Sequence, residues 1–101
     1  MAKEEARGLW ARRCDLLVLA SAIQDELDDI ERRRLEGIRV YEHDWAKAPP
    51  AWQHSEAGKA YTRTHLGRNE RLAQDRFIWE SRLRSIHDQV ARFSALLTVY
   101  G

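Results

Sequence analysis

Two adjacent prolines, Pro49 and Pro50, are the strongest constraint on the fold of this chain, because they are its only prolines and stand near its midpoint. Proline removes a backbone donor and pushes the preceding residue out of the helical region, so no helix continues through both. With 101 residues, the chain has room for one domain. The sequence therefore predicts a single helical domain over 1–101, with a turn over about 45–54.

Apolar residues recur at steps of three and four on both sides of this turn, which is typical of helices that bury one face. Before the turn they predict a helix over about 3–44, and after it a helix over about 55–100 that begins with Ser55 as N-cap. A break near Gly67 stays open, since Asn69 could start a new helix. The stripe of the first helix contains Leu16, Ala20, Ile23, Leu27 and Ile30, and the heptad seam of the second contains Leu72, Trp79, Leu83, Ile86, Val90, Phe93, Leu97 and Tyr100.

The predicted fold class is all-α: a long, coiled-coil-like antiparallel helical hairpin. Arg, Glu, Leu and Ala dominate the composition, which favours long helices. A turn at the prolines would set the acidic residues between 25 and 31 opposite Arg68, Arg71 and Arg76. This charge match would disfavour a parallel or slipped pairing.

Several large apolar residues lie off these stripes, so a lone hairpin would leave them exposed. Burial of each would gain about 1.5–3 kcal/mol. We therefore expect a homodimer in which two hairpins form a four-helix bundle, or a different protein partner on the same surface. Trp45 and Trp52, beside the prolines, either close the end of the bundle or take part in binding. The expected interface contains Trp10, Cys14, Leu17, Leu35, Phe77, Ile78, Trp45 and Trp52.

The charge balance argues against binding to nucleic acid through the molecule as a whole. Seventeen basic residues against sixteen acidic ones give a net charge of +1, which provides little long-range attraction. Local clustering on the second helix is the alternative, and it would neutralise phosphates without reading sequence. The candidate residues are Arg63, Arg71, Arg82 and Arg84.

One polar group interrupts the apolar stripe. Arg34 falls on that stripe, and His65 and Asn69 would face it across the hairpin. A buried guanidinium needs a carboxylate or an anionic ligand. This zone either fixes the register of the hairpin or forms a small polar pocket.

No catalytic set is recognisable, and no cofactor or metal is expected. The chain lacks a nucleophile-elbow motif, a glycine-rich phosphate loop and the helical histidine pairs of zinc enzymes. Its longest apolar run, from Leu16 to Ala20, is far too short to span a bilayer or form a signal segment. The sequence favours a small cytoplasmic, non-catalytic interaction protein, such as an adaptor, accessory subunit or inhibitor, and its arginine-rich composition suits a bacterial or phage origin.

Overall fold

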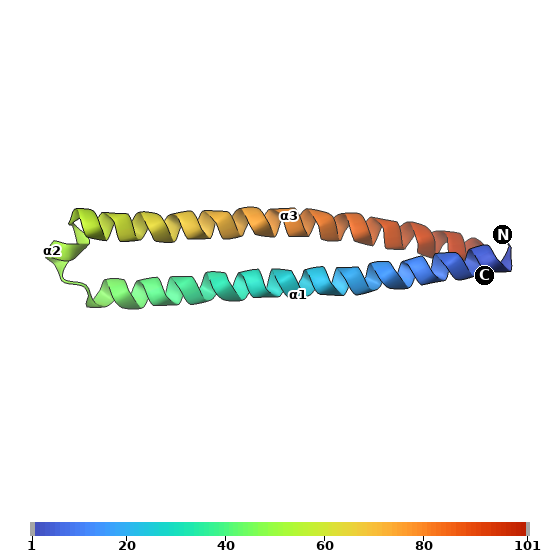
Figure 1. The fold of residues 1–101 in the computed structure, drawn as a ribbon, viewed down its shortest axis with the longest axis horizontal. Helices are drawn as coiled ribbons and strands as arrows, with labels where there is room; N and C mark the ends of the chain where they lie inside the picture. The colour runs from blue at the N-terminus through green and yellow to red at the C-terminus, as the bar shows by residue number, and fades with distance from the viewer. Residues whose placement is uncertain (1, 101) are drawn as a thin grey trace. The chain divides into compact units, whose positions relative to one another are not determined.

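The computed structural model describes residues 2–100 and consists of helices joined by a short turn (Figure 1). Helix α1 spans Lys3–Lys47, the one-turn helix α2 spans Pro50–Gln53, and α3 spans Glu56–Tyr100. No strand occurs among residues 2–100, so the all-α prediction is confirmed. The side chain of Tyr100, predicted to end the seam of the second helix, lies outside the described part of the chain.

The prolines end α1 and start α2. Helix α1 runs three residues beyond its predicted end and includes Trp45, while the backbone N–H of Ala48 still donates to the carbonyl of Asp44 at 3.1 Å. Pro49 is extended, with φ −61° and ψ 146°, and Pro50 occupies the first position of α2. A missing N–H costs nothing at that position, because the first N–H groups of a helix have no intrahelical acceptor.

Ser55 caps α3, as predicted. Its Oγ accepts a hydrogen bond from the backbone N–H of Gly58 at 3.2 Å and donates to the carbonyl of Trp52 at 2.5 Å. Of the two possibilities left open near Gly67, the structure shows the unbroken helix, because α3 continues through this residue without interruption. A single glycine costs a helix about 1 kcal/mol and does not by itself end one.

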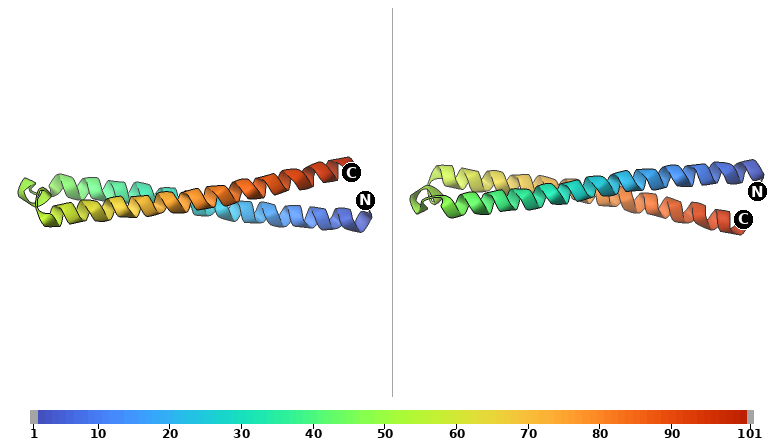
Figure 2. Two further views of the ribbon diagram at one scale, coloured as in Figure 1. Left: turned by 90° about the horizontal axis from the view of Figure 1, so that it is seen from above. Right: turned by 90° about the horizontal axis from the view of Figure 1, so that it is seen from below.

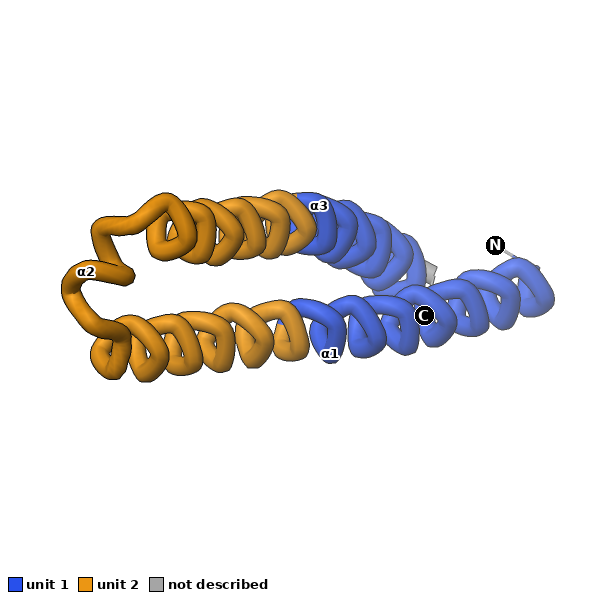
Figure 3. Tube along the Cα trace, turned by 60° about the vertical axis from the view of Figure 1, so that its left-hand side comes forward, with its two compact units in different colours: residues 1–27, 78–101 blue, residues 28–77 orange. Residues whose placement is uncertain are grey.

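The chain forms two compact units (Figure 3). Unit 1 contains the first part of α1, up to Leu27, and the last part of α3, from Ile78. Unit 2 comprises Asp28–Phe77 and includes the turn. Within each unit a segment of α1 lies beside a segment of α3, as the two views of Figure 2 also indicate.

The core of unit 1 is built from the predicted stripes. Ala20, Ile23 and Ile86 are buried against one another. The partly buried residues packed around them are Leu16, Leu27, Trp79, Leu83 and Val90. The periodicity in the sequence therefore predicted which faces of these two segments meet.

Unit 2 has a small apolar core, with Ile30 only 1% exposed and Leu72 also buried. Towards the turn, aromatic side chains replace aliphatic ones: Tyr41 stacks on His65 with 4.2 Å between ring centroids and hydrogen-bonds Thr62 through its hydroxyl at 3.0 Å. Aromatic packing therefore joins α1 to α3 beside the turn.

The predicted charge match between the helices is found at one of its three arginines. Arg76 approaches Glu31 at 3.9 Å, but Arg68 and Arg71 make no ion pair within the described residues. Instead, carboxylates of α1 pair along their own helix, as in the contact of Asp29 with Arg32 at 2.6 Å. Helix α1 ends at Lys47 and α3 begins at Glu56, so the connection is centred beyond the prolines. This shifts the α3 segment relative to the register expected for a turn centred on Pro49 and Pro50.

Candidate partner-binding surfaces and an aromatic groove

Unit 1 exposes an apolar stripe on α1. Trp10, Cys14 and Leu17 follow one another at steps of four and three, so they share one side of the helix. Trp10 is 52% exposed and Leu17 is 40% exposed, and Cys14 is exposed as well. All three are predicted interface residues. We call this stripe the Trp10 flank.

A groove lies beside the Trp10 flank. Its volume is about 310 Å³, and it lies between α1 and α3 within unit 1. Arg13 crosses the groove, because its Nε donates to the Oγ of Ser94 at 2.8 Å while its guanidinium lies 5.6 Å from the centre of the Trp10 ring. The lining residues are Trp10, Arg13, Ser94, Leu97 and Thr98.

A second apolar surface of unit 1, which we call the Leu19 flank, contains the exposed side chains of Leu19 and Ile78. Here the guanidinium of Arg82 lies over the ring of Trp79, 4.8 Å from its centre. A groove of about 430 Å³ opens on this flank. Its lining residues are Leu19, Ile23, Trp79, Arg82, Ser85 and Ile86.

The remaining predicted interface residues differ in their exposure to solvent. Phe77 is 66% exposed and Leu35 is also exposed, which leaves both accessible to a partner. Trp45 and Trp52 are half-buried and contact each other edge to face, with 6.0 Å between their centroids. The two tryptophans therefore pack within the turn end of unit 2.

Tyr41 is the centre of an aromatic cluster in unit 2. Its ring stacks on three others, with centroid distances of 4.2 Å to His65, 5.5 Å to Trp45 and 5.6 Å to Tyr61. Trp52 packs against Tyr61 at 5.7 Å and so brings α2 into the cluster. Aromatic pairs of this kind contribute about 0.5–1.5 kcal/mol beyond the area they bury.

A hydrogen bond closes one side of this cluster. The hydroxyl of Tyr61 donates to Oδ2 of Asp44 at 2.7 Å. This bond, with a weaker contribution from His43, lowers the pKa of Asp44 below its ordinary value, and the same bond raises the pKa of Tyr61.

An open groove of about 290 Å³ lies beside the cluster, between α1 and α3 of unit 2. The guanidinium of Arg68 reaches from α3 onto Gly37 of α1, where a Cβ would overlap its Nη1. Its Nη2 donates to the carbonyl of Arg33 at 3.3 Å. The lining residues are Glu36, Gly37, Val40, Tyr41, Tyr61, Thr64, His65 and Arg68.

The predicted polar pocket is brought together only in part. His65 and Asn69 contact each other, with 3.1 Å between the ring Nε2 and the amide Nδ2. Arg34 instead binds Glu31 through two contacts of 2.6 and 2.9 Å, which lower the pKa of that carboxyl. The carboxylate that a guanidinium on this stripe requires therefore comes from its own helix.

Sequence reasoning missed Gly37, Arg68 and Tyr41 as neighbours in one groove. Two signals were available. Gly37 stands on the apolar stripe where a large side chain is usual, which indicates that another group approaches the backbone there. The pairs Tyr41–Trp45 and Tyr61–His65 are each four residues apart, which places the members of each pair together on one face.

The arginines proposed for nucleic-acid binding are all exposed. The guanidinium of Arg82 lies over the ring of Trp79. The Nη2 of Arg84 donates a hydrogen bond to the hydroxyl of Ser81 at 3.2 Å. Arg63 and Arg71 lie on the part of α3 in unit 2, and none of the four makes an ion pair with another described residue. These four arginines are therefore exposed on α3 without an ion pair to another described residue.

Two features are absent from the described part of the chain. Residues 2–100 hold no group of three or more histidine, cysteine or acidic side chains placed to bind a metal ion. Their helices include none with the length and hydrophobicity that crossing a bilayer requires. No protein-family model, curated protein or solved structure matches this chain.

Proposed function

We propose that this chain is a non-catalytic protein-interaction module, folded back as an antiparallel helical hairpin and associating with a second copy to form a four-helix bundle. As a dimer it would act as an adaptor, accessory subunit or inhibitor. The observation that carries this proposal is the exposure of large apolar side chains that two packed helices leave uncovered. Trp10, Leu17 and Phe77 are each at least 40% exposed.

The exposed area is large enough for a second copy to cover part of this surface. A compact monomer of 11.8 kDa would expose about 5,900 Å² by the usual scaling of surface with mass, but this chain exposes 7503 Å². If two copies each buried the excess of about 1,600 Å², the interface would cover about 3,200 Å² in total, within the range of obligate homodimers.

The Trp10 flank is the proposed contact. Its three apolar residues form a continuous stripe, and an adjoining groove could receive side chains from the other copy. On both flanks an arginine lies over a tryptophan, at 5.6 Å on the Trp10 flank and at 4.8 Å on the Leu19 flank. Trp10 is nevertheless 52% exposed whereas Trp79 is half-buried, so the Trp10 flank leaves its tryptophan more accessible to a second copy. Two-fold symmetry would bring the same stripe of each copy together, which is the commonest arrangement of homodimers.

Substitution of aspartate at three successive positions tests this assignment. Leu17, Val18 and Leu19 point about 100° apart around α1, and Val18 is already 71% exposed. Leu17→Asp should convert the dimer to monomer because it would bury a charge in the contact. Val18→Asp is the matched control and should leave the dimer intact. Sedimentation velocity of the three variants at equal concentration provides the measurement.

The outcome of this series identifies the surface used. Dissociation by Leu17→Asp alone supports the Trp10 flank. Dissociation by Leu19→Asp alone would contradict that assignment and move the contact to the Leu19 flank. Dissociation by Val18→Asp alone would contradict a contact centred on either Leu17 or Leu19, since the Val18 side chain lies about 100° around the helix from each of them.

A nucleic-acid-binding role is the second candidate, and the uncompensated arginines of α3 favour it. Arg63, Arg71, Arg82 and Arg84 make no ion pair within residues 2–100 and could neutralise phosphates. Binding would be insensitive to sequence and would weaken steeply as salt is raised. Gel shifts of duplex DNA and single-stranded RNA across a salt series test it. Absence of a shift at about 50 mM salt removes this candidate.

A further inference from the structure

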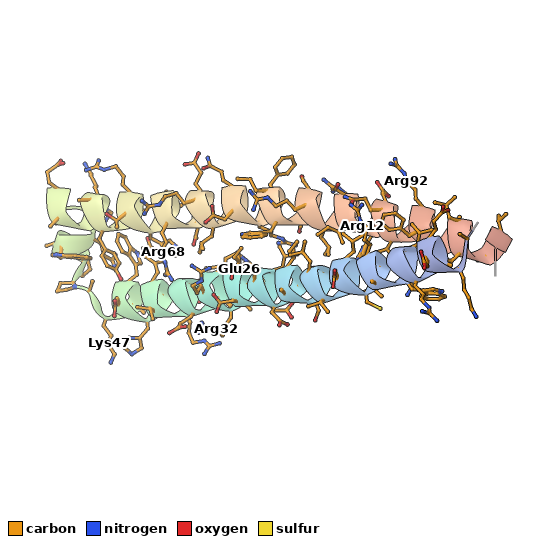
Figure 4. All side chains as sticks on the ribbon, turned by 45° about the vertical axis from the view of Figure 1, so that its right-hand side comes forward. Arg12, Glu26, Arg32, Lys47, Arg68 and Arg92 are labelled. Carbon is orange, nitrogen blue, oxygen red and sulfur yellow. The ribbon has the colours of Figure 1, made fainter. Side chains whose placement is uncertain are left out.

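The groove of unit 2 contains a cation that has no anionic partner in the described part of the chain. Arg68 is half-buried and makes no ion pair with the described residues. Its hydrogen bond from Nη2 to the carbonyl of Arg33 measures 3.3 Å, which is long for a charged donor. Figure 4 shows Arg68 between α1 and α3, whereas Arg32 points away from α3. Most N–H groups of this guanidinium therefore remain available to an acceptor.

The carboxylates nearest this groove are already engaged. Glu36 lines the groove, but its Oε2 contacts Nη1 of Arg32 at 3.3 Å. Asp44, near the other end of the cluster, accepts the hydroxyl hydrogen of Tyr61 at 2.7 Å. A partly desolvated guanidinium favours an anion that binds through two oxygens, because its N–H groups form a planar fork.

The rest of the groove is apolar and aromatic. Val40 is exposed here, and the stacked rings of Tyr41 and His65 form part of the lining together with Tyr61. A volume of about 290 Å³ suits a small organic molecule. Planar side chains in parallel orientation complement a planar ring better than an aliphatic chain.

We propose that this groove binds a small aryl carboxylate, with the carboxylate on the guanidinium of Arg68 and the ring beside Val40, Tyr61 and His65. Gly37 makes the site possible, because only a residue without Cβ leaves space for the Arg68 guanidinium to lie against α1. This site does not depend on the association of two copies, and it lies wholly within unit 2.

Titration with 2-naphthoate tests the proposal, and 2-naphthamide is the matched neutral probe with nearly the same shape. Binding is measured on the full-length chain by NMR, from the shifts of the His65 ring and the Arg68 side chain. The naphthoate should perturb both residues saturably and bind at least tenfold more tightly than the amide, as expected for a charge-assisted pair. Acetate serves as a second probe, and it should bind more weakly than the naphthoate because it lacks the ring.

Two variants separate this site from general attraction to a cationic surface. Arg68→Gln should weaken naphthoate binding about tenfold or more. Gly37→Ala should weaken it as well, since the added Cβ displaces the guanidinium while the helix itself tolerates alanine. Arg63→Gln is the control, because Arg63 is exposed on the same helix and does not line the groove.

Three results would overturn the proposal. One is the absence of saturable shifts at millimolar naphthoate, and another is equal affinity for the naphthoate and the amide. The third is binding that both Arg68→Gln and Gly37→Ala leave unchanged. If Arg68→Gln failed to fold, Gly37→Ala would decide the matter by itself.

Discussion

The hydroxyl of Tyr61 donates to the carboxylate of Asp44, with 2.7 Å between Oη and Oδ2. This bond joins α3 to α1 within unit 2, next to the turn. Because the neutral phenol stabilises the ionised carboxylate, the pKa of Asp44 falls and the pKa of Tyr61 rises.

These opposite shifts predict a stability that declines at both extremes of pH. The contribution of Asp44 is present above its unfolded-state pKa of about 4 and is lost as the pH falls through its lower folded-state pKa. The contribution of Tyr61 is present below its unfolded-state pKa of about 10 and is lost as the pH rises through its higher folded-state pKa.

Tyr61→Phe should remove both effects. Between pH 5 and 9, about one unit inside the two ordinary pKa values, the variant should melt a few degrees below the wild type. The difference should shrink in strong acid and strong base. Thermal melts of both proteins across the pH range provide the measurement. A difference in Tm that does not change with pH would show that the variant loses stability through altered packing of the ring and not through loss of the hydrogen bond.

Gly58 and Gly67 lie in the same helix but should respond oppositely to alanine. At Gly58 a Cβ would collide with the backbone carbonyls of Trp52 and Gln53, which cannot move aside easily. Gly58→Ala should therefore destabilise the fold by about 1–3 kcal/mol. At Gly67 a Cβ meets nothing within 4 Å, so Gly67→Ala should stabilise it by about 0.5–1 kcal/mol.

Urea denaturation of the two alanine variants provides the measurement. Each variant serves as the control for the other, because the chemical change and the helix are the same. A gain of stability in Gly58→Ala would contradict the close approach of α2 to the start of α3.

Ile30 should be the most sensitive aliphatic position of unit 2. It is 1% exposed, so Ile30→Ala leaves a cavity and should cost about 2–5 kcal/mol. Val40→Ala, on the same helix and in the same unit at a 53% exposed site, should change the stability by no more than about 0.5 kcal/mol. Equal losses in the denaturation curves of the two variants would show that Val40 is covered in solution.

The helices and their buried faces were predictable because they depend on local periodicity. Apolar residues spaced three and four apart identify the core of unit 1, such as Ile23 and Ile86. Ser55, as an N-cap residue, predicts the start of α3. These features depend only on residues that are close together along the chain, and the sequence gives their identity and spacing directly.

The pairing across the turn was less predictable, because it depends on how many residues the turn contains. The sequence alone does not show that residues 50–53 form α2, and this extra turn changes which residues of α3 face α1. For the same reason, the contact of Arg68 with Gly37 was not foreseen. A glycine on an apolar stripe hints at a close approach but does not identify the approaching group.

The molar mass of the chain in solution tests the central claim most directly. Sedimentation equilibrium of the full-length protein from about 1 to 100 μM, a range that spans common dimer affinities, measures it. The account predicts twice the chain mass of 11.8 kDa over the upper part of this range, with little binding of a hydrophobic dye. A single-chain mass at every concentration, with Trp10 and Leu17 accessible to solvent, would contradict it.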